Sequence, residues 1–124
     1  MTSLRAAPGV LAESFGHFRR CGRGWRECVV YWTGQLAEPG LVDQVVHPVH
    51  IATPFGYEVD SSWITAFFGQ LHEQRRSARV QVHTHPGPSW HSQTDDLFAL
   101  APAPGFLSLV IPDYGRGPVS LDNA

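Results

Sequence analysis

Cysteine is scarce in this chain, which argues against a disulfide framework and against a zinc site of the Cys-x-x-Cys type. Only Cys21 and Cys28 are present among 124 residues, too few for the disulfide framework of a small secreted domain. Their separation also differs from the Cys-x-x-Cys spacing of a thiolate zinc site. We therefore expect a protein of a reducing, cytoplasmic compartment, in which Cys28 is a small buried residue.

Long apolar runs and a large net charge are also absent. No run approaches the ~20 apolar residues of a transmembrane helix. Glu13 interrupts the apolar stretch after Pro8, where a signal peptide would need its hydrophobic region. We therefore expect no membrane partner. The net charge of −2 and the pI near 6.3 argue against a broad phosphate-binding surface, and so against nucleic acid as a partner.

No repeat or low-complexity linker divides the chain, and 43% of its residues are hydrophobic, which is enough to bury one core. We predict a single domain over residues 1–124. The chain ends soon after its last predicted strand, which is compatible with a C-terminal truncation that removes an edge strand.

Local patterns predict an alternation of helices and strands. Helical spacing of apolar residues and helix-end signals predict three helices, over residues 8–20, 60–76 and 92–100. Runs of β-branched and aromatic residues predict four strands, over residues 27–33, 42–52, 78–83 and 106–111. Ser61 or Ser62 is the expected cap of the second helix. The order predicts one mixed α/β domain.

His83 and His85 are the strongest indication of a metal site. Residues two apart in an extended chain point to the same face, so both imidazoles face one point at the end of their strand. The prolines and glycine of 86–88 then turn the chain. A helix that starts at Ser92 places Asp95 in its first turn. Two imidazoles and a carboxylate leave a fourth position for water, as in a catalytic zinc site.

Each part of this pattern also has a simpler interpretation. A His-x-His pair is usually a surface feature, and Ser92-x-x-Asp95 is most often a helix cap with an acidic residue that the helix dipole favours. Glu27 lies in an otherwise apolar strand, where a buried carboxylate requires a positive partner, or at the solvated end of that strand. His47 and His50, three residues apart in one predicted strand, would lie on opposite faces and would not share a metal.

Taken together, these residues resemble the signature of the JAB1/MPN/Mov34 (JAMM) metalloenzyme family. The matching text is Glu27 with the strand that ends at Gly34, then His83-Thr-His-Pro86, then Ser92-Gln-Thr-Asp95. The resemblance covers the chain from Glu27 to about Asp113. It implies a single mixed-sheet MPN (cytidine-deaminase-like) domain with flanking helices.

The loop before Ser92 is one residue shorter than is usual in the family. Keeping the usual interval would select Gln93 and Asp96 instead, and would lose the serine. Neighbouring helical residues point ~100° apart, so only one of Asp95 and Asp96 can reach the metal. We favour Asp95 because this choice also keeps Ser92 and the helix cap.

The resemblance implies a zinc-dependent isopeptidase or peptidase of a minimal, prokaryote-type form. In that reading His83, His85 and Asp95 bind Zn²⁺, Glu27 is the general base, and Ser92 donates a hydrogen bond to the oxyanion. The implied substrate is the C-terminal tail of a ubiquitin-like or sulfur-carrier protein. The alternatives are a non-catalytic MPN scaffold, a zinc peptidase acting on other peptides, and a DNA-repair-associated relative. Homodimer formation remains open.

Overall fold

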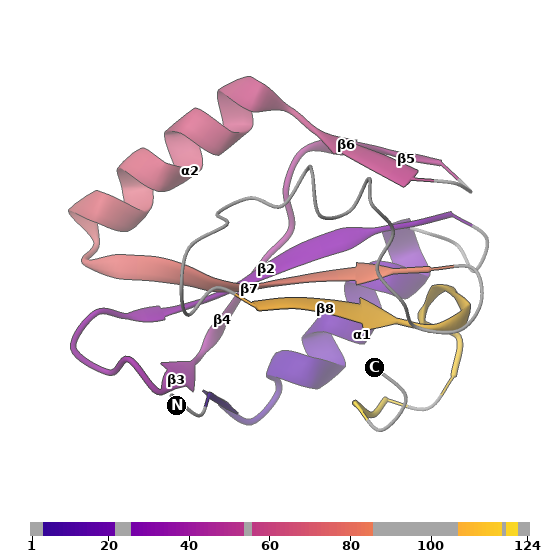
Figure 1. Ribbon diagram of the computed structural model, residues 1–124, viewed down its shortest axis with the longest axis horizontal. Helices are drawn as coiled ribbons and strands as arrows, with labels where there is room; N and C mark the ends of the chain where they lie inside the picture. Colours follow the sequence, from indigo (N-terminus) through magenta and orange to yellow (C-terminus); the bar gives the residue numbers. More distant parts are fainter. Residues whose placement is uncertain (1–3, 22–25, 54–55, 86–106, 118, 122–124) are drawn as a thin grey trace.

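The computed structural model describes residues 4–21, 26–53, 56–85, 107–117 and 119–121. Within this part of the chain, two helices are interspersed among short and long strands (Figure 1). In chain order the elements are β1 (Arg5–Ala6), α1 (Val10–Cys21), β2 (Val29–Gln35), β3 (Leu41–Val42), β4 (Gln44–Val46), β5 (His50–Thr53), β6 (Gly56–Val59), α2 (Ser61–Glu73), β7 (Arg76–Thr84), β8 (Leu107–Ile111) and a 3-10 turn (Asp113–Gly115). The predicted mixed α/β class is confirmed.

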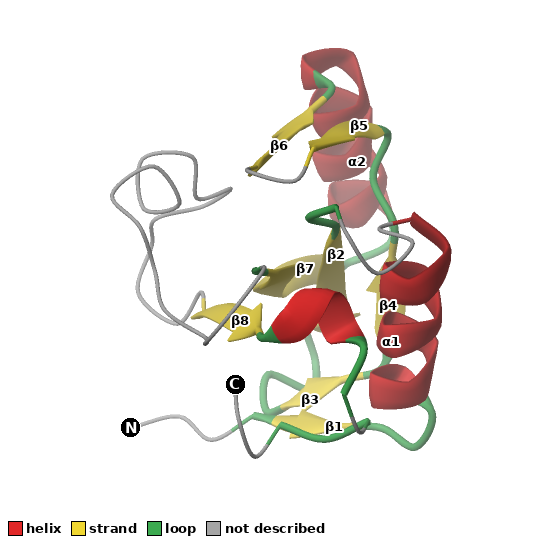
Figure 2. Cartoon of the chain, turned by 90° about the vertical axis from the view of Figure 1, so that its right-hand side faces the viewer, coloured by secondary structure: helices red, strands yellow, loops and turns green. Residues whose placement is uncertain are grey.

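Four strands form the central sheet, in the order β4-β2-β7-β8. Strand β2 runs antiparallel to both β4 and β7, whereas β8 runs parallel to β7, so the sheet is mixed. Two smaller sheets pair β1 with β3 and β5 with β6. The β5–β6 pair forms a separate sheet, and β6 leads through a short turn into the start of α2 (Figure 1 and Figure 2).

Helix α1 covers one face of the central sheet. Its residues Phe15 and Phe18 are buried, and they pack with strand-side residues that include Cys28, Val30 and Val82. Phenylalanine at these positions gives α1 a continuous apolar stripe toward the sheet, which is what holds a short helix in place. Cys28 therefore points to the α1 face.

Helix α2 packs against the β2 side chains that point away from α1. Phe67 and Leu71 form a second buried cluster with Val29 and Tyr31. Trp63 extends this cluster, since its ring stacks on Phe67 at a centroid distance of 4.7 Å. Successive strand residues face opposite sides, so β2 contributes alternate residues to the α1 and α2 cores.

The two helices and three strands agree with prediction to within two residues at most ends. The helix over 8–20 corresponds to α1, and the strands over 27–33, 78–83 and 106–111 correspond to β2, β7 and β8. The helix predicted over 92–100 lies outside the described residues. Neither α1 nor α2 is long and apolar enough to cross a membrane.

Helix α2 begins and ends differently from its predicted bounds of 60–76. Asp60 caps it instead of Ser61 or Ser62, because the Asp60 carboxylate accepts a hydrogen bond from the Ser62 N–H at 2.9 Å. The helix ends early because Arg75 adopts a left-handed conformation, with φ 54. Strand β7 starts at the next residue.

The single strand predicted over residues 42–52 is wrong. The structure divides this stretch among β3, β4 and β5, and of these only β4 belongs to the central sheet. Pro48 lies between β4 and β5, and it has no backbone N–H to continue a strand ladder. His50 therefore begins β5, which pairs with β6, whereas His47 directly follows β4.

Gly34 occupies a crowded position near the end of β2. A Cβ atom at this position would clash with the Leu41 carbonyl oxygen and the Arg79 guanidinium group. Arg79 crosses this region to donate a hydrogen bond to the Glu38 carbonyl oxygen at 2.7 Å. Glycine is thus required here for a close backbone approach.

Candidate functional site

The pairing of β2 with β7 brings Glu27 next to the end of the histidine strand. Cys28, directly before β2, pairs with Thr84 at the end of β7. Its N–H donates to Thr84 Oγ1 at 2.9 Å, and its carbonyl oxygen accepts from the Thr84 N–H at 3.0 Å. The residues that flank this antiparallel pair, Glu27 and His85, therefore lie opposite each other and on the same face.

Glu27, His83 and His85 form a buried group. Their exposed fractions are 4%, 0% and 4% respectively. Glu27 Oε1 lies 3.5 Å from His85 Nε2, and the imidazole centroids of His83 and His85 are 5.0 Å apart. The two simpler interpretations, a surface histidine pair and a glutamate at the solvated end of its strand, are therefore wrong.

The backbone at His85 is also held from its other side. Its N–H donates to the Ile111 carbonyl oxygen at 2.9 Å, and its carbonyl oxygen accepts from the Tyr114 N–H at 2.9 Å. The end of β7 is therefore fixed between the entry to β2 and the end of β8. Side chains on such a supported backbone keep a defined geometry, which both metal binding and catalysis require.

Two buried imidazoles beside a carboxylate have the chemistry to bind a metal ion and to move a proton. Neutral imidazole nitrogens are common zinc ligands. A carboxylate next to them can accept a proton from a molecule bound at the same site. The structure thus brings together Glu27, His83 and His85, three of the residues that the sequence singled out. Their roles as base and ligands stay predictions.

The rest of the predicted site lies outside the described residues. This holds for Ser92 and Asp95, and for the alternative pair Gln93 and Asp96. The third metal ligand and the oxyanion donor are therefore predictions that rest on the sequence.

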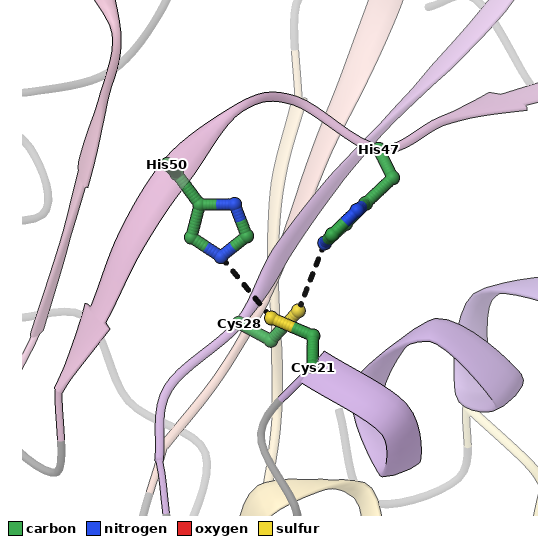
Figure 3. A group of neighbouring side chains, drawn as sticks. All are labelled: Cys21, Cys28, His47 and His50. Atoms are coloured by element: carbon green, nitrogen blue, oxygen red, sulfur yellow. Dashed lines mark hydrogen bonds between the residues drawn. The ribbon is translucent and has the colours of Figure 1, made fainter.

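A second group of potential metal ligands was not found from the sequence. Cys21 ends α1, Cys28 precedes β2, His47 follows β4 and His50 begins β5 (Figure 3). One ligand atom from each of these side chains lies within 4.8 Å of the other three. Figure 3 shows both imidazoles directed at the two sulfur atoms.

The expectation that His47 and His50 lie on opposite faces of one strand is therefore wrong. Both side chains turn toward Cys21 and Cys28 because the chain bends at Pro48 rather than continuing as a strand. The expectation that Cys28 is buried is confirmed. The proline between the two histidines was the one local signal that could have revealed this convergence.

Hydrogen bonds within the cluster shift the pKa values of Cys21, Cys28 and His50. The bond with Cys28, assisted by bonds with His47 and His50, lowers the pKa of the Cys21 thiol far below its ordinary value despite burial. The same hydrogen bond between the two cysteine side chains, together with burial, raises the pKa of the Cys28 thiol. Burial lowers the pKa of His50, but its hydrogen bonds with Cys21 and Pro48 outweigh burial and raise it. The pKa values of the two thiols are therefore shifted in opposite directions.

Comparison with known proteins identifies a bacterial relative of this chain. No model of a protein family matches the sequence. The chain is 33% identical over 107 residues to a protein of Sinorhizobium fredii (strain NBRC 101917 / NGR234) named "Probable metalloprotease y4jG". The similarity covers 82% of this chain and 66% of that protein, so the chain spans just under two thirds of its relative's length. The chain is therefore similar to a protein that carries a metalloprotease name.

Proposed function

We propose that this chain is a metal-dependent peptidase whose active site contains Glu27, His83 and His85. The observation that carries the proposal is the buried contact of 3.5 Å between Glu27 Oε1 and His85 Nε2, next to the buried imidazole of His83. A carboxylate and two histidines are seldom buried together without a functional reason, because each loses hydration. The name of the Sinorhizobium relative supports the same class of activity.

Zinc is the metal that we propose, bound by His83, His85 and Asp95. The donor set fits, since two imidazoles and one carboxylate are typical of catalytic zinc sites that keep a position for water. A zinc ion bound there would supply Lewis-acid activation of a water molecule and of the substrate carbonyl.

The chain's own residues then perform the proton transfers. Glu27 accepts a proton from the attacking water and later delivers it to the leaving amine, so that the carboxylate is regenerated after each turnover. Its burial keeps bulk water away from this proton. Ser92 donates a hydrogen bond to the oxyanion that develops on the scissile carbonyl, a contact that contributes on the order of 3 kcal/mol.

We propose further that the chain is a JAMM-type isopeptidase with an MPN fold. One support is the position of Glu27 before β2, with the histidine pair at the end of the neighbouring strand β7. Another is Gly34, which matches the glycine of the family signature and lies so close to the Leu41 carbonyl oxygen that no other residue fits there. The substrate would be the extended C-terminal tail of a ubiquitin-like or sulfur-carrier protein in the cytoplasm. An extended tail can bind by adding its backbone to a strand edge.

Cleavage of candidate substrates tests the proposed activity. The purified chain is incubated with fusions that carry a protein after the C-terminal tail of a ubiquitin-like or sulfur-carrier protein, and the products are measured by mass spectrometry. We expect cleavage directly after the tail, loss of cleavage with a chelator, and recovery on addition of zinc. Cleavage that persists unchanged in the chelator would contradict a metal-dependent peptidase.

A further inference from the structure

Four side chains on the other face of the central sheet are arranged as a metal-binding set. We propose that Cys21, Cys28, His47 and His50 bind a zinc ion in a closed, structural site. The proposal stands on the positions of their four ligand atoms, and it does not depend on the peptidase activity.

The spacing of these atoms matches a tetrahedral zinc site. Zn–S bonds of ~2.3 Å and Zn–N bonds of ~2.0–2.1 Å at tetrahedral angles place the ligand atoms ~3.3–3.8 Å apart. Cys21 Sγ lies 3.2 Å from His50 Nε2, and Cys28 Sγ lies 3.5 Å from His47 Nε2. Since all four atoms lie within 4.8 Å of one another, an ion can be bound with side-chain movements of at most about 1 Å.

The ring of His50 is already oriented as a metal ligand. Its Nδ1 lies 2.9 Å from the Pro48 carbonyl oxygen, a partner that can only accept a hydrogen bond. Nδ1 therefore carries a proton, which leaves Nε2, the nitrogen next to the sulfur of Cys21, as the one available to a metal. A ligand histidine held by a backbone carbonyl through its other nitrogen is the usual arrangement around protein-bound metals.

The ligand chemistry selects zinc and a structural role. Two thiolates and two imidazoles form a tetrahedral set that suits zinc better than magnesium or calcium, which prefer oxygen ligands. The two thiolates also neutralise the charge of the ion. Four protein ligands complete the coordination, so no position is left for water or substrate. This cluster is therefore unsuited to catalysis, in contrast to the group at Glu27.

The site would connect the ends of separate elements of the fold. It joins the end of α1, the entry to β2 and the turn between β4 and β5. Cys28 directly follows Glu27 in the chain, but alternate residues face opposite sides, so Cys28 points toward α1 while Glu27 points toward His85. The ion would thus fix the backbone next to the proposed base without contacting the substrate.

A disulfide between Cys21 and Cys28 is the competing explanation for the proximity of the two sulfurs. Both cysteines are free thiols in the structure. A disulfide would need only these two residues, whereas two imidazole nitrogens also converge on the sulfurs. Metal binding accounts for all four positions.

Cobalt binding to the reduced, metal-free chain tests the proposal. Co²⁺ replaces Zn²⁺ in tetrahedral sites, and thiolate ligands give it a charge-transfer absorption that imidazole and carboxylate ligands do not. We expect this band to rise with added Co²⁺ and to disappear when zinc displaces the cobalt. Cys21→Ser should remove about half of the band, because one of two thiolates is lost. Loss of a residue that only hydrogen-bonds to a metal ligand typically weakens metal binding ~10–100-fold. His50→Ala removes a ligand itself, so it should weaken zinc binding by more than this.

Two controls separate this site from the proposed active site. His83→Ala should leave the thiolate–cobalt band unchanged, so a failure of the peptidase proposal would not affect this result. His72→Ala, at an exposed position of α2, should change neither the band nor the zinc content. The proposal is overturned if the reduced wild-type chain shows no thiolate–cobalt band. It is also overturned if Cys21→Ser retains the full zinc content and the wild-type chain carries a Cys21–Cys28 disulfide.

Discussion

Replacement of Glu27 by glutamine is expected to abolish turnover while zinc remains bound. The amide keeps the size of the side chain but cannot accept a proton from water, and a general base typically contributes ~10²–10⁴-fold to the rate. Because the proposed ligands are His83, His85 and Asp95, the metal content should not change. Steady-state kinetics and elemental analysis of the same preparation measure both quantities.

Glu58→Gln is the matched control, because Glu58 is an exposed residue of β6. This variant should retain both the zinc content and the kcat of the wild-type chain. If Glu27→Gln turns over at the wild-type rate, Glu27 is not the base. If it loses zinc to the same extent as activity, Glu27 acts as a ligand and the assigned roles are wrong.

Replacement of His83 by alanine is expected to remove the active-site metal and the activity together. His83 is 0% exposed, and alanine offers no ligand atom in its place, so the loss of one of three protein ligands should exceed ~100-fold in affinity. Activity should fall to the level of the chelated wild-type enzyme, and the chain should bind one zinc ion fewer.

A buried histidine can also be needed for folding, so a second measurement must show that this variant is folded. Circular dichroism should show a folded chain, and the thiolate–cobalt band of the Cys21 cluster should persist as an internal reference for native structure. A folded His83→Ala chain that keeps its full zinc content and activity would exclude His83 as a ligand.

The local part of this site was predictable from the sequence. The alternation in β7 places His83 and His85 on one face whatever the strand pairs with, and both are found there. An acidic residue inside an apolar stretch identified Glu27 as unusual, and its contact with His85 explains how the strand tolerates it. What the sequence could not supply was the register, since the pairing of Cys28 with Thr84 decides that Glu27 lies opposite His85.

The failures share a physical cause. Residues 42–52 have strand propensity throughout, but one missing N–H at Pro48 and the demands of tertiary packing divide them. The cluster of Cys21, Cys28, His47 and His50 then forms from segments that are not adjacent in the sequence. No local spacing rule predicts that the end of α1, the entry to β2 and the turn between β4 and β5 bring their ligands to one point. The cap at Asp60 is a smaller case, because several neighbouring polar residues compete for the same role.

Anomalous scattering at the zinc absorption edge, measured from crystals of the zinc-loaded chain, tests the central claim most directly. We predict a peak within bonding distance of one nitrogen each of His83 and His85, with the Glu27 carboxylate beside it but not bound to it. The same map identifies Asp95 or Asp96 as the third ligand. A chain that cleaves its substrate and shows no anomalous peak between His83 and His85 would contradict the account.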